Sequence, residues 1–372
     1  MYRVLRAHRG LQWPAPTLVR SRRTLVTDVD VDKARQYCIA QLRQSDYDAF
    51  LIRNFIPESR RDAYDAFRAL NLELVRLPEL VSTPVIGQLR FQFWRDAINN
   101  TFAGRPPKEP IMILLHSVLS RLAADADASP ESSSSPSSIR FWLLRIINTR
   151  EKHMDNRPFP TLSALEEYAE NTYSTLMYAM LAALSVQSMH IDHLASHIGK
   201  ACGIAAMCRG IPVLASPTPS VKGPDGANVA ASRNPVILLP LDVMAETGLK
   251  EEDVYRYGPK AEGFRDAVFN VATRANDHLI TAREMLKNIR AGEHPGHEYE
   301  HEGEEHHQHP VSELGKDGVD PLLQRGFGVL LEGIPADYYL ARLETENFNP
   351  FTVKAGWKLP WRLWRAYRTQ QI

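Results

Sequence analysis

The chain has 372 residues, 44% of them hydrophobic, and its 44 basic side chains balance 44 acidic ones. This length is enough to bury a substantial core in one large or two ordinary domains. The zero net charge gives no global argument for nucleic-acid binding. The three cysteines, Cys38, Cys202 and Cys208, are odd in number and lack metal-site spacing, which favours a reducing compartment without a disulfide framework.

Residues 1–27 have the composition of a mitochondrial transit peptide. They contain six arginines and no acid, since the first acidic residue is Asp28. A positive amphipathic segment is drawn toward the negative matrix, and cleavage is expected near Arg22 and Arg23. The alternative is a disordered basic tail. No later run approaches the roughly 18 apolar residues that span a bilayer, so we expect the mature protein to be soluble or peripheral.

Beyond the predicted transit peptide, apolar residues recur mostly at helical intervals. In residues 31–51, for example, Ala34, Cys38 and Leu42 share one helical face. Pro57 opens the next helix, because proline is tolerated in a first turn. Further helices are predicted over residues 64–77, 86–102, 110–123, 139–154, 162–184, 190–214, 249–257 and 262–289. Few stretches alternate with a period of two, so the sequence predicts a single all-α domain over residues 28–372.

Three polar segments are predicted to interrupt the helices as flexible insertions. They span residues 125–138, 216–235 and 292–319, and the first two are rich in Ser, Pro or Gly. The third contains six histidines among glutamates, a mixture that suits zinc, nickel or copper. The histidines are irregularly spaced, which favours a solvated loop over a metal site. They are His294, His297, His301, His306, His307 and His309.

Two stretches of the chain resemble the squalene/phytoene synthase family. The first runs from Ala66 to Glu79 and continues from Ile86 to Asp96, and the second runs from Gly199 to Ile211. The resemblance implies helices that surround a central cavity. Active members of the family carry aspartate-rich motifs at both sites, because the Mg²⁺ ions that hold a diphosphate need several carboxylate oxygens aimed into one cavity.

Both aspartate-rich motifs are largely missing from this sequence. At the first site, the family's three aspartate positions fall on Val75, Arg76 and Glu79, so that Glu73 and Glu79 are the only acids there. At the second site, only Arg209 of the family pattern is retained. Two glutamates cannot hold a magnesium cluster. The sequence therefore predicts a catalytically inactive member of the family, with no metal and no cofactor.

The resemblance extends to a non-enzymatic branch of the family, which implies a role in assembling mitochondrial respiratory complex I at an early step on the matrix side. The implied partners are complex I subunits or early assembly intermediates, together with the surface of the inner membrane. The alternative is a prenyl-diphosphate transferase or a lipid-binding protein that retains a remnant pocket. Arginines such as Arg90 more often connect neighbouring helices than bind a ligand. The candidate pocket residues are Glu73, Arg76, Glu79, Arg90 and Arg209.

The C-terminal segment combines tryptophan with positive charge. Three of the six tryptophans and four cations fall within residues 357–368. Trp favours the membrane interface, and neighbouring Arg or Lys attracts anionic headgroups. The alternative is that the tryptophans, spaced at i, i+4 and i+7, pack onto the helical bundle. The candidate docking residues are Trp357, Lys358, Trp361, Arg362, Trp364 and Arg365.

Overall fold

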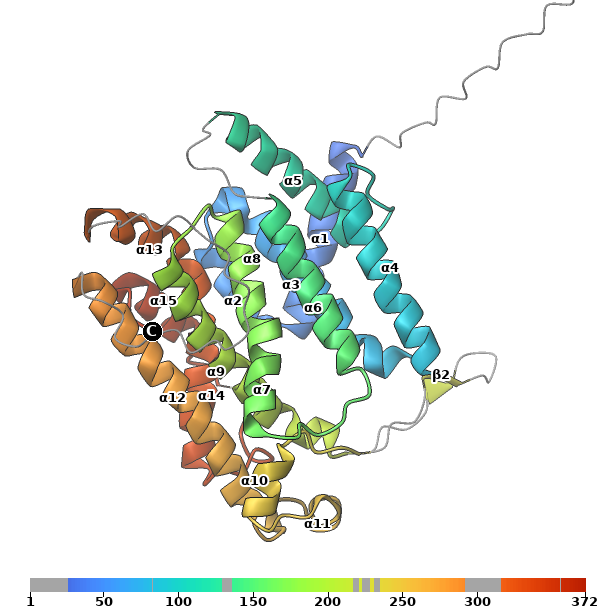
Figure 1. The fold of residues 1–372 in the computed structure, drawn as a ribbon, viewed down its shortest axis with the longest axis vertical. Helices are drawn as coiled ribbons and strands as arrows, with labels where there is room; N and C mark the ends of the chain where they lie inside the picture. Colours follow the sequence, from blue (N-terminus) through green and yellow to red (C-terminus); the bar gives the residue numbers. More distant parts are fainter. Residues whose placement is uncertain are drawn as a thin grey trace, which may run out of the picture.

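The computed structural model describes residues 26–81, 83–128, 136–216, 221–222, 228–230, 235–291, 316–354 and 356–372. These residues are almost entirely helical, which confirms the predicted all-α class (Figure 1). Nearly all of the predicted transit peptide and the whole histidine-rich stretch of the third insertion lie outside the described residues. None of the described helices is both long enough and apolar enough to cross a membrane.

The helices and strands follow one another along the chain without a central sheet. The first α-helices are α1 (Asp28–Ser45), α2 (Tyr47–Ile52), α3 (Arg61–Leu80), α4 (Pro84–Phe102), α5 (Pro110–Ala128), α6 (Pro136–Lys152), α7 (Leu162–Ala169) and α8 (Thr175–Ala183). They are followed by α9 (Met189–Leu214), α10 (Leu241–Glu246), α11 (Glu251–Tyr257), α12 (Phe264–Ala291), α13 (Lys316–Leu330), α14 (Gly333–Thr345) and α15 (Leu359–Thr369). Short 3₁₀ turns cover Arg53–Phe55, Glu58–Arg60 and Gly258–Lys260. The described strands, β1 (Val221–Lys222) and β2 (Asn228–Ala230), form a small antiparallel hairpin.

Local sequence signals set where several helices begin. Thr27 accepts a hydrogen bond from the backbone N–H of Asp30, and the Asp30 side chain accepts one from the Thr27 backbone, so α1 starts with a complete capping box. Thr83 caps α4 in the same position, and Pro84 occupies the first turn, where its missing N–H costs nothing. These caps fix the ends of two helices that pack around α3.

Helix α9 lies at the centre of the molecule and packs against α7, α8, α12 and α14 (Figure 1). Its first half contributes Ile191, Leu194 and Ile198 to a buried cluster shared with α1, α3, α4, α5, α6 and α8. Its second half contributes Ile204 and Cys208 to a second cluster shared with α7, α10, α12 and α14. One helix therefore completes two hydrophobic cores.

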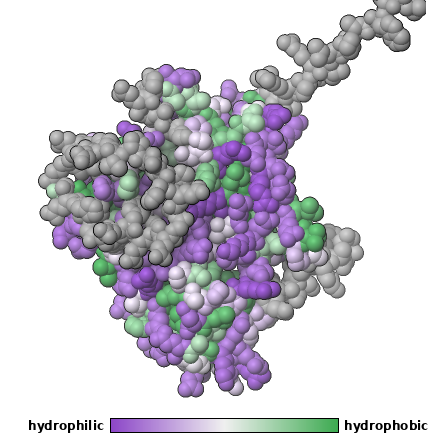
Figure 2. Space-filling view, in the orientation of Figure 1, coloured by the Kyte–Doolittle hydropathy of each residue, from purple (hydrophilic) through white to green (hydrophobic). Residues whose placement is uncertain are grey.

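Helix α4 packs through one face only. Phe91 and Ile98 are fully buried, whereas Val85, Leu89 and Phe93 on another face are 63%, 65% and 47% exposed. Figure 2 shows a green, hydrophobic area at the right edge of the molecule, on the side where α4 lies in Figure 1. Much of the rest of this view is hydrophilic.

Several element boundaries differ from the sequence-based prediction. The predicted helix over residues 162–184 is divided by a π-helical turn, Glu170–Ser174. Helix α5 continues to Ala128 and α13 begins at Lys316, so parts of the first and third predicted insertions are helical. Helices α13 and α14 were not predicted, because each has proline and glycine near its start, and α13 also begins within the third polar insertion.

Candidate functional site

A small cavity lies beside the second family-like segment, on α9. Its volume is about 50 Å³, which is room for a few water molecules and far below the roughly 300–1,000 Å³ of ordinary ligand pockets. Side chains from five parts of the fold meet there: the α1–α2 junction, α3, the π-helical turn, the middle of α9 and the start of α14. The lining residues are Asp46, Asp48, Arg68, Tyr173, Cys202, Ala205, Ala206, Arg209, Glu332, Pro335, Ala336 and Tyr339.

A network of buried charged side chains lies along one side of this cavity. Arg68 on α3 donates one hydrogen bond to Asp46 at 2.6 Å and another to Glu332 at 3.2 Å. The Tyr64 hydroxyl donates to the second oxygen of Glu332 at 2.6 Å. The side chains of Arg68 and Glu332 are only 13% and 11% exposed. The network thereby joins α3 to the α1–α2 junction and to the segment that precedes α14.

Burial is the main influence on the pKa of Glu332, one of the two acids in this network. It raises the pKa of Glu332, while Arg68 and the Tyr64 hydroxyl act in the opposite direction. The Arg68 Nε and the Tyr339 hydroxyl, which are buried, have no hydrogen-bond partner among the described residues. Both residues line the cavity.

Arg209 lies on the outer side of the cavity. It pairs with Asp48 at 2.8 Å, and its side chain is 55% exposed. A pair with this exposure contributes little to stability, because water screens it. It does occupy Asp48, a carboxylate that would otherwise be available to a cation at the cavity.

The other predicted pocket residues are not among those that line the cavity. Arg76 on α3 donates hydrogen bonds to Gln41, at 3.0 Å, and to Ser45, both on α1. Glu73 is half-buried, whereas Glu79 and Arg90 are exposed. Arg76 thus joins α3 to α1. In the described part of the chain, no three His, Cys, Asp or Glu side chains are placed to hold a metal ion.

Arg95, near the end of the family-like stretch from Ile86 to Asp96, has a structural role, as is usual for arginine. Arg95 on α4 pairs with Glu151 on α6 at 2.5 Å, and Trp94 beside it is 6% exposed. These two residues hold α4 against α6 and do not contribute to the cavity.

The predicted docking residues lie on and just before α15. Trp357, Trp361 and Trp364 are 84%, 57% and 53% exposed, so they do not pack onto the bundle. Arg362 differs from its neighbours, because it pairs with Asp337 at 3.3 Å and stacks on the Tyr338 ring at 4.5 Å. Its role is to hold α15 against α14.

The sequence model of the squalene/phytoene synthase family matches residues 42–365 of the chain. The chain belongs to the squalene/phytoene synthase family. Among curated proteins it is 32% identical over 278 residues to "NADH dehydrogenase (ubiquinone) complex I, assembly factor 6" of Mus musculus, covering 75% of this chain and 74% of the relative. It is also 32% identical to the Homo sapiens protein of that name, over 68% and 66% of the two chains.

Solved structures of the family have the same fold. The crystal structure of the squalene synthase HpnC from Alicyclobacillus acidocaldarius matches with a TM-score of 0.59 and 14% identity, covering 88% of this chain and 98% of that one. At this identity the match establishes the fold only. The expectation of helices in the arrangement of the squalene/phytoene synthase family is therefore confirmed.

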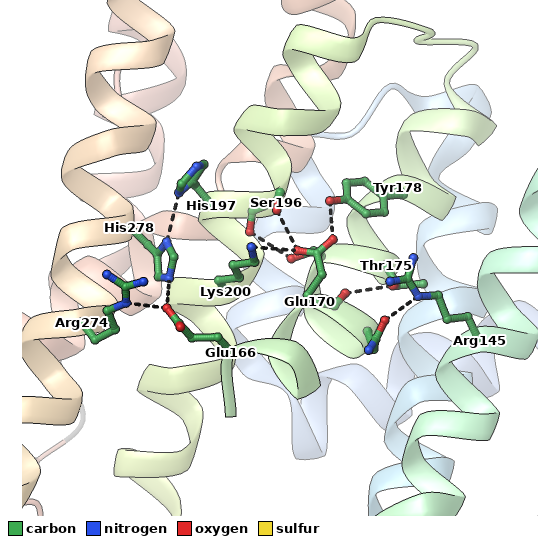
Figure 3. Close-up of polar contacts among 12 residues, drawn as sticks. Arg145, Glu166, Glu170, Thr175, Tyr178, Ser196, His197, Lys200, Arg274 and His278 are labelled. Atoms are coloured by element: carbon green, nitrogen blue, oxygen red, sulfur yellow. Dashed lines mark hydrogen bonds and ion pairs between the residues drawn. The ribbon is translucent and has the colours of Figure 1, made fainter. Parts of the chain in front are cut away.

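A second polar network, which sequence reasoning missed, joins the π-helical turn to α8 and α9 (Figure 3). Glu170, in the π-helical turn, is 7% exposed and accepts hydrogen bonds from Tyr178 and Ser196, both at 2.7 Å. The Lys200 ammonium lies 4.0 Å away. Gly199 allows this approach, because a Cβ there would lie 2.4 Å from the backbone of Ser174. A buried glutamate four residues after Glu166 gave no local signal of these partners.

A neighbouring set of residues ties α7 to α12. His278 bonds through Nε2 to Glu166 at 2.7 Å and through Nδ1 to His197 at 3.0 Å, and Arg274 pairs with the same glutamate at 2.5 Å (Figure 3). Burial alone would raise the pKa of Glu166, but His278 and Arg274 hold it below its usual value. The contacts bring together α7, α9 and α12, which also share the second hydrophobic core.

The Glu170 network makes the fold sensitive to acid. Burial alone would raise the pKa of Glu170, but Lys200 and the hydroxyls of Tyr178 and Ser196 lower it below 4.5. Its ionised form therefore stabilises the fold above that pH, and the stabilisation is lost as the pH falls below it. We expect Glu170→Gln to cost about 1–3 kcal/mol near neutral pH and to lose less stability on acidification.

Urea unfolding of both proteins at about pH 6 and about pH 3.5 measures this difference. Glu252→Gln, at an exposed pair with Arg256, is the control and should follow the parent protein at both pH values. A parallel loss of stability in Glu170→Gln and the parent would contradict the assignment.

Proposed function

We propose that this protein supports the assembly of mitochondrial respiratory complex I, at an early step on the matrix side, as a catalytically inactive member of the squalene/phytoene synthase family. The observation that carries this proposal is the 32% identity, over three quarters of the chain, to a protein named as a complex I assembly factor. In this role the helical body acts as a scaffold whose partners are complex I subunits or early assembly intermediates.

The chemistry of the cavity supports catalytic inactivity. Ionisation of a prenyl diphosphate needs Mg²⁺ held by several carboxylates. The carboxylates at the cavity are engaged by arginines instead, Asp46 and Glu332 by Arg68 and Asp48 by Arg209. A magnesium ion would have to displace guanidinium groups and would then lie close to them. The small volume of the cavity argues in the same direction.

The proposed location is the matrix face of the inner membrane, with peripheral attachment. The arginine-rich, acid-free residues 1–27 support mitochondrial import. Absence of a helix able to span a bilayer among the described residues is compatible with peripheral attachment. The C-terminal tryptophans and cations are the candidate contact with the membrane.

Deletion of the protein in its own cells tests the assembly role. Native gels of respiratory complexes should show selective loss of mature complex I and accumulation of an early subassembly, with the other complexes unchanged. Expression of the intact chain should restore complex I, and pull-down from the rescued cells should recover the stalled subassembly. Normal complex I in the deleted cells, or an equal decline of all quinone-dependent complexes, would overturn the proposal.

The alternative, a prenyl-diphosphate transferase or lipid-binding protein, is supported by one observation: Arg209, retained from the family pattern, lies at the cavity. Calorimetric titration with farnesyl diphosphate, with and without Mg²⁺, separates the two functions. We expect no magnesium-dependent binding. Saturable binding that requires Mg²⁺ would favour the transferase.

A further inference from the structure

Helix α15 has two chemically different faces. Leu359, Leu363 and Ala366 are buried against the bundle. Successive residues of a helix are about 100° apart, so Trp361, Trp364, Arg365 and Arg368 fall on the opposite side. Those four side chains point to solvent. We call this side, together with the exposed Trp357 and Lys358 just before the helix, the aromatic-cationic face.

The inner face holds α15 firmly in place. Arg362 bonds to Asp337, which also pairs with Arg283 on α12 at 2.6 Å. The Tyr367 ring packs at 5.1 Å from Phe55 and 6.4 Å from Phe327, measured between ring centroids. The aromatic-cationic face is therefore presented by a fixed helix, whose side chains lose little backbone freedom when they bind.

On the outer side, each of the three tryptophans has a basic side chain stacked over its ring. Lys358 lies 5.6 Å from the centroid of Trp357, Arg365 lies 5.7 Å from Trp361, and Arg368 lies 5.9 Å from Trp364. Within the described part of the chain, these three cations have no ion pair with an acid, in contrast to Arg362. Residues 347–372 contain no Asp or Glu. The whole segment is thus positive and aromatic.

This chemistry matches an anionic lipid surface better than a protein groove. Indole rings are stabilised at the boundary between headgroups and acyl chains, and long basic side chains reach from there to phosphates. Each cation near an anionic bilayer strengthens binding about fivefold. A protein groove that covered the tryptophans would bury the three stacked cations as well, and would have to supply an acid for each of them.

We propose that the aromatic-cationic face docks on the surface of an anionic phospholipid bilayer, with α15 lying parallel to the membrane plane. This proposal rests on the proposed function only for the identity of the membrane that the protein meets in the cell. The binding itself can be measured with purified protein and lipid. The cations would select anionic headgroups, while the tryptophans would enter the interface.

Vesicle binding by the intact chain tests this proposal. Phosphatidylcholine vesicles with phosphatidylglycerol should bind the protein, and pure phosphatidylcholine vesicles should bind it far less. Two triple variants address the two parts of the face, and a third removes three exposed cations elsewhere. They are Lys358→Gln/Arg365→Gln/Arg368→Gln, Trp357→Ser/Trp361→Ser/Trp364→Ser, and the control Arg157→Gln/Arg256→Gln/Lys287→Gln.

Neutralising the face should weaken binding to anionic vesicles on the order of 100-fold, whereas the control should bind nearly as well as the parent. The tryptophan variant should lose binding and also the blue shift of indole emission that the parent shows on adding vesicles. All nine substituted positions are exposed, so each variant is expected to fold. Circular dichroism checks that it does.

The proposal fails if the parent binds neutral and anionic vesicles alike, or if the face variant and the control bind equally. These outcomes are distinct from failure of the assembly role. A chain that restores complex I but ignores anionic vesicles would disprove lipid docking and leave α15 as a surface for a protein. A chain that binds vesicles but does not restore complex I would disprove the assembly role alone.

Discussion

Replacing Arg68 by methionine is expected to lower the free energy of unfolding by about 3–5 kcal/mol, because it leaves Asp46 and Glu332 without their cation in a buried site. The side chains of these acids are 18% and 11% exposed. Tyr64 would remain as a donor to Glu332, but it cannot neutralise the charge. Urea denaturation of the intact chain, followed by far-ultraviolet circular dichroism, measures the change.

The matched control is Arg256→Met. Arg256 pairs with Glu252 within α11, but both side chains are more than 60% exposed, so the loss should be below about 0.5 kcal/mol. A second variant, Arg68→Met with Glu332→Gln, should recover part of the lost stability, since one uncompensated charge is removed. Equal losses in Arg68→Met and Arg256→Met would show that the cavity network does not stabilise the fold.

Replacing Gly199 by alanine should have an effect of similar size, about 3 kcal/mol. The added Cβ would meet the backbone of Ser174 at 2.4 Å, and backbone cannot move aside as the end of a flexible side chain can. Helix α9 and the π-helical turn would have to separate. The hydrogen bond from Ser174 Oγ to the Ser196 carbonyl, 3.0 Å long, crosses the same contact and would be strained as well.

Gly210→Ala on the same helix is the control. A Cβ at Gly210 would meet only the end of the Leu214 side chain, at 3.4 Å. Alanine in a helix is favoured over glycine by about 0.5–1 kcal/mol, so this variant should be slightly more stable than the parent. Thermal unfolding of both variants gives the comparison, and a stable Gly199→Ala protein would mean that α9 and the π-helical turn can move apart at little cost.

The fold class was predictable because helical periodicity is local. The spacing of Ala34, Cys38 and Leu42 predicts one buried face, and all three are buried in α1. The breaks were harder to predict, since the π-helical turn at Glu170 packs closely against Gly199, a residue that is distant in sequence. Short α13 and α14 depend on tertiary packing for the same reason.

The cavity was only partly predictable. Arg209 was recognised from the family pattern, and the structure places it at the cavity. Arg68 and Glu332 are 264 positions apart and pair only because α3 and the start of α14 meet. Nothing local marks either residue as a member of a pair. Acids and arginines are common on helices, and their partners are set by the arrangement of whole helices.

The C-terminal face was predictable in composition but not in orientation. The spacing of Trp357, Trp361 and Trp364 fits a helix that points its tryptophans either inward or outward. Leu359 and Leu363 decide between the two, because only one side of a short helix can be buried against the bundle. Arg362 could not be separated from the outward cations without the position of Asp337.

Helix α9, which completes two hydrophobic cores, has a consequence for inherited or engineered changes. Neither core can open alone without exposing half of the helix's apolar surface. A destabilising substitution in either half of α9 is therefore expected to weaken both cores and to disturb the cavity beside this helix. In a cell, such variants are expected to lower the amount of folded protein, while the molecules that do fold keep their normal contacts.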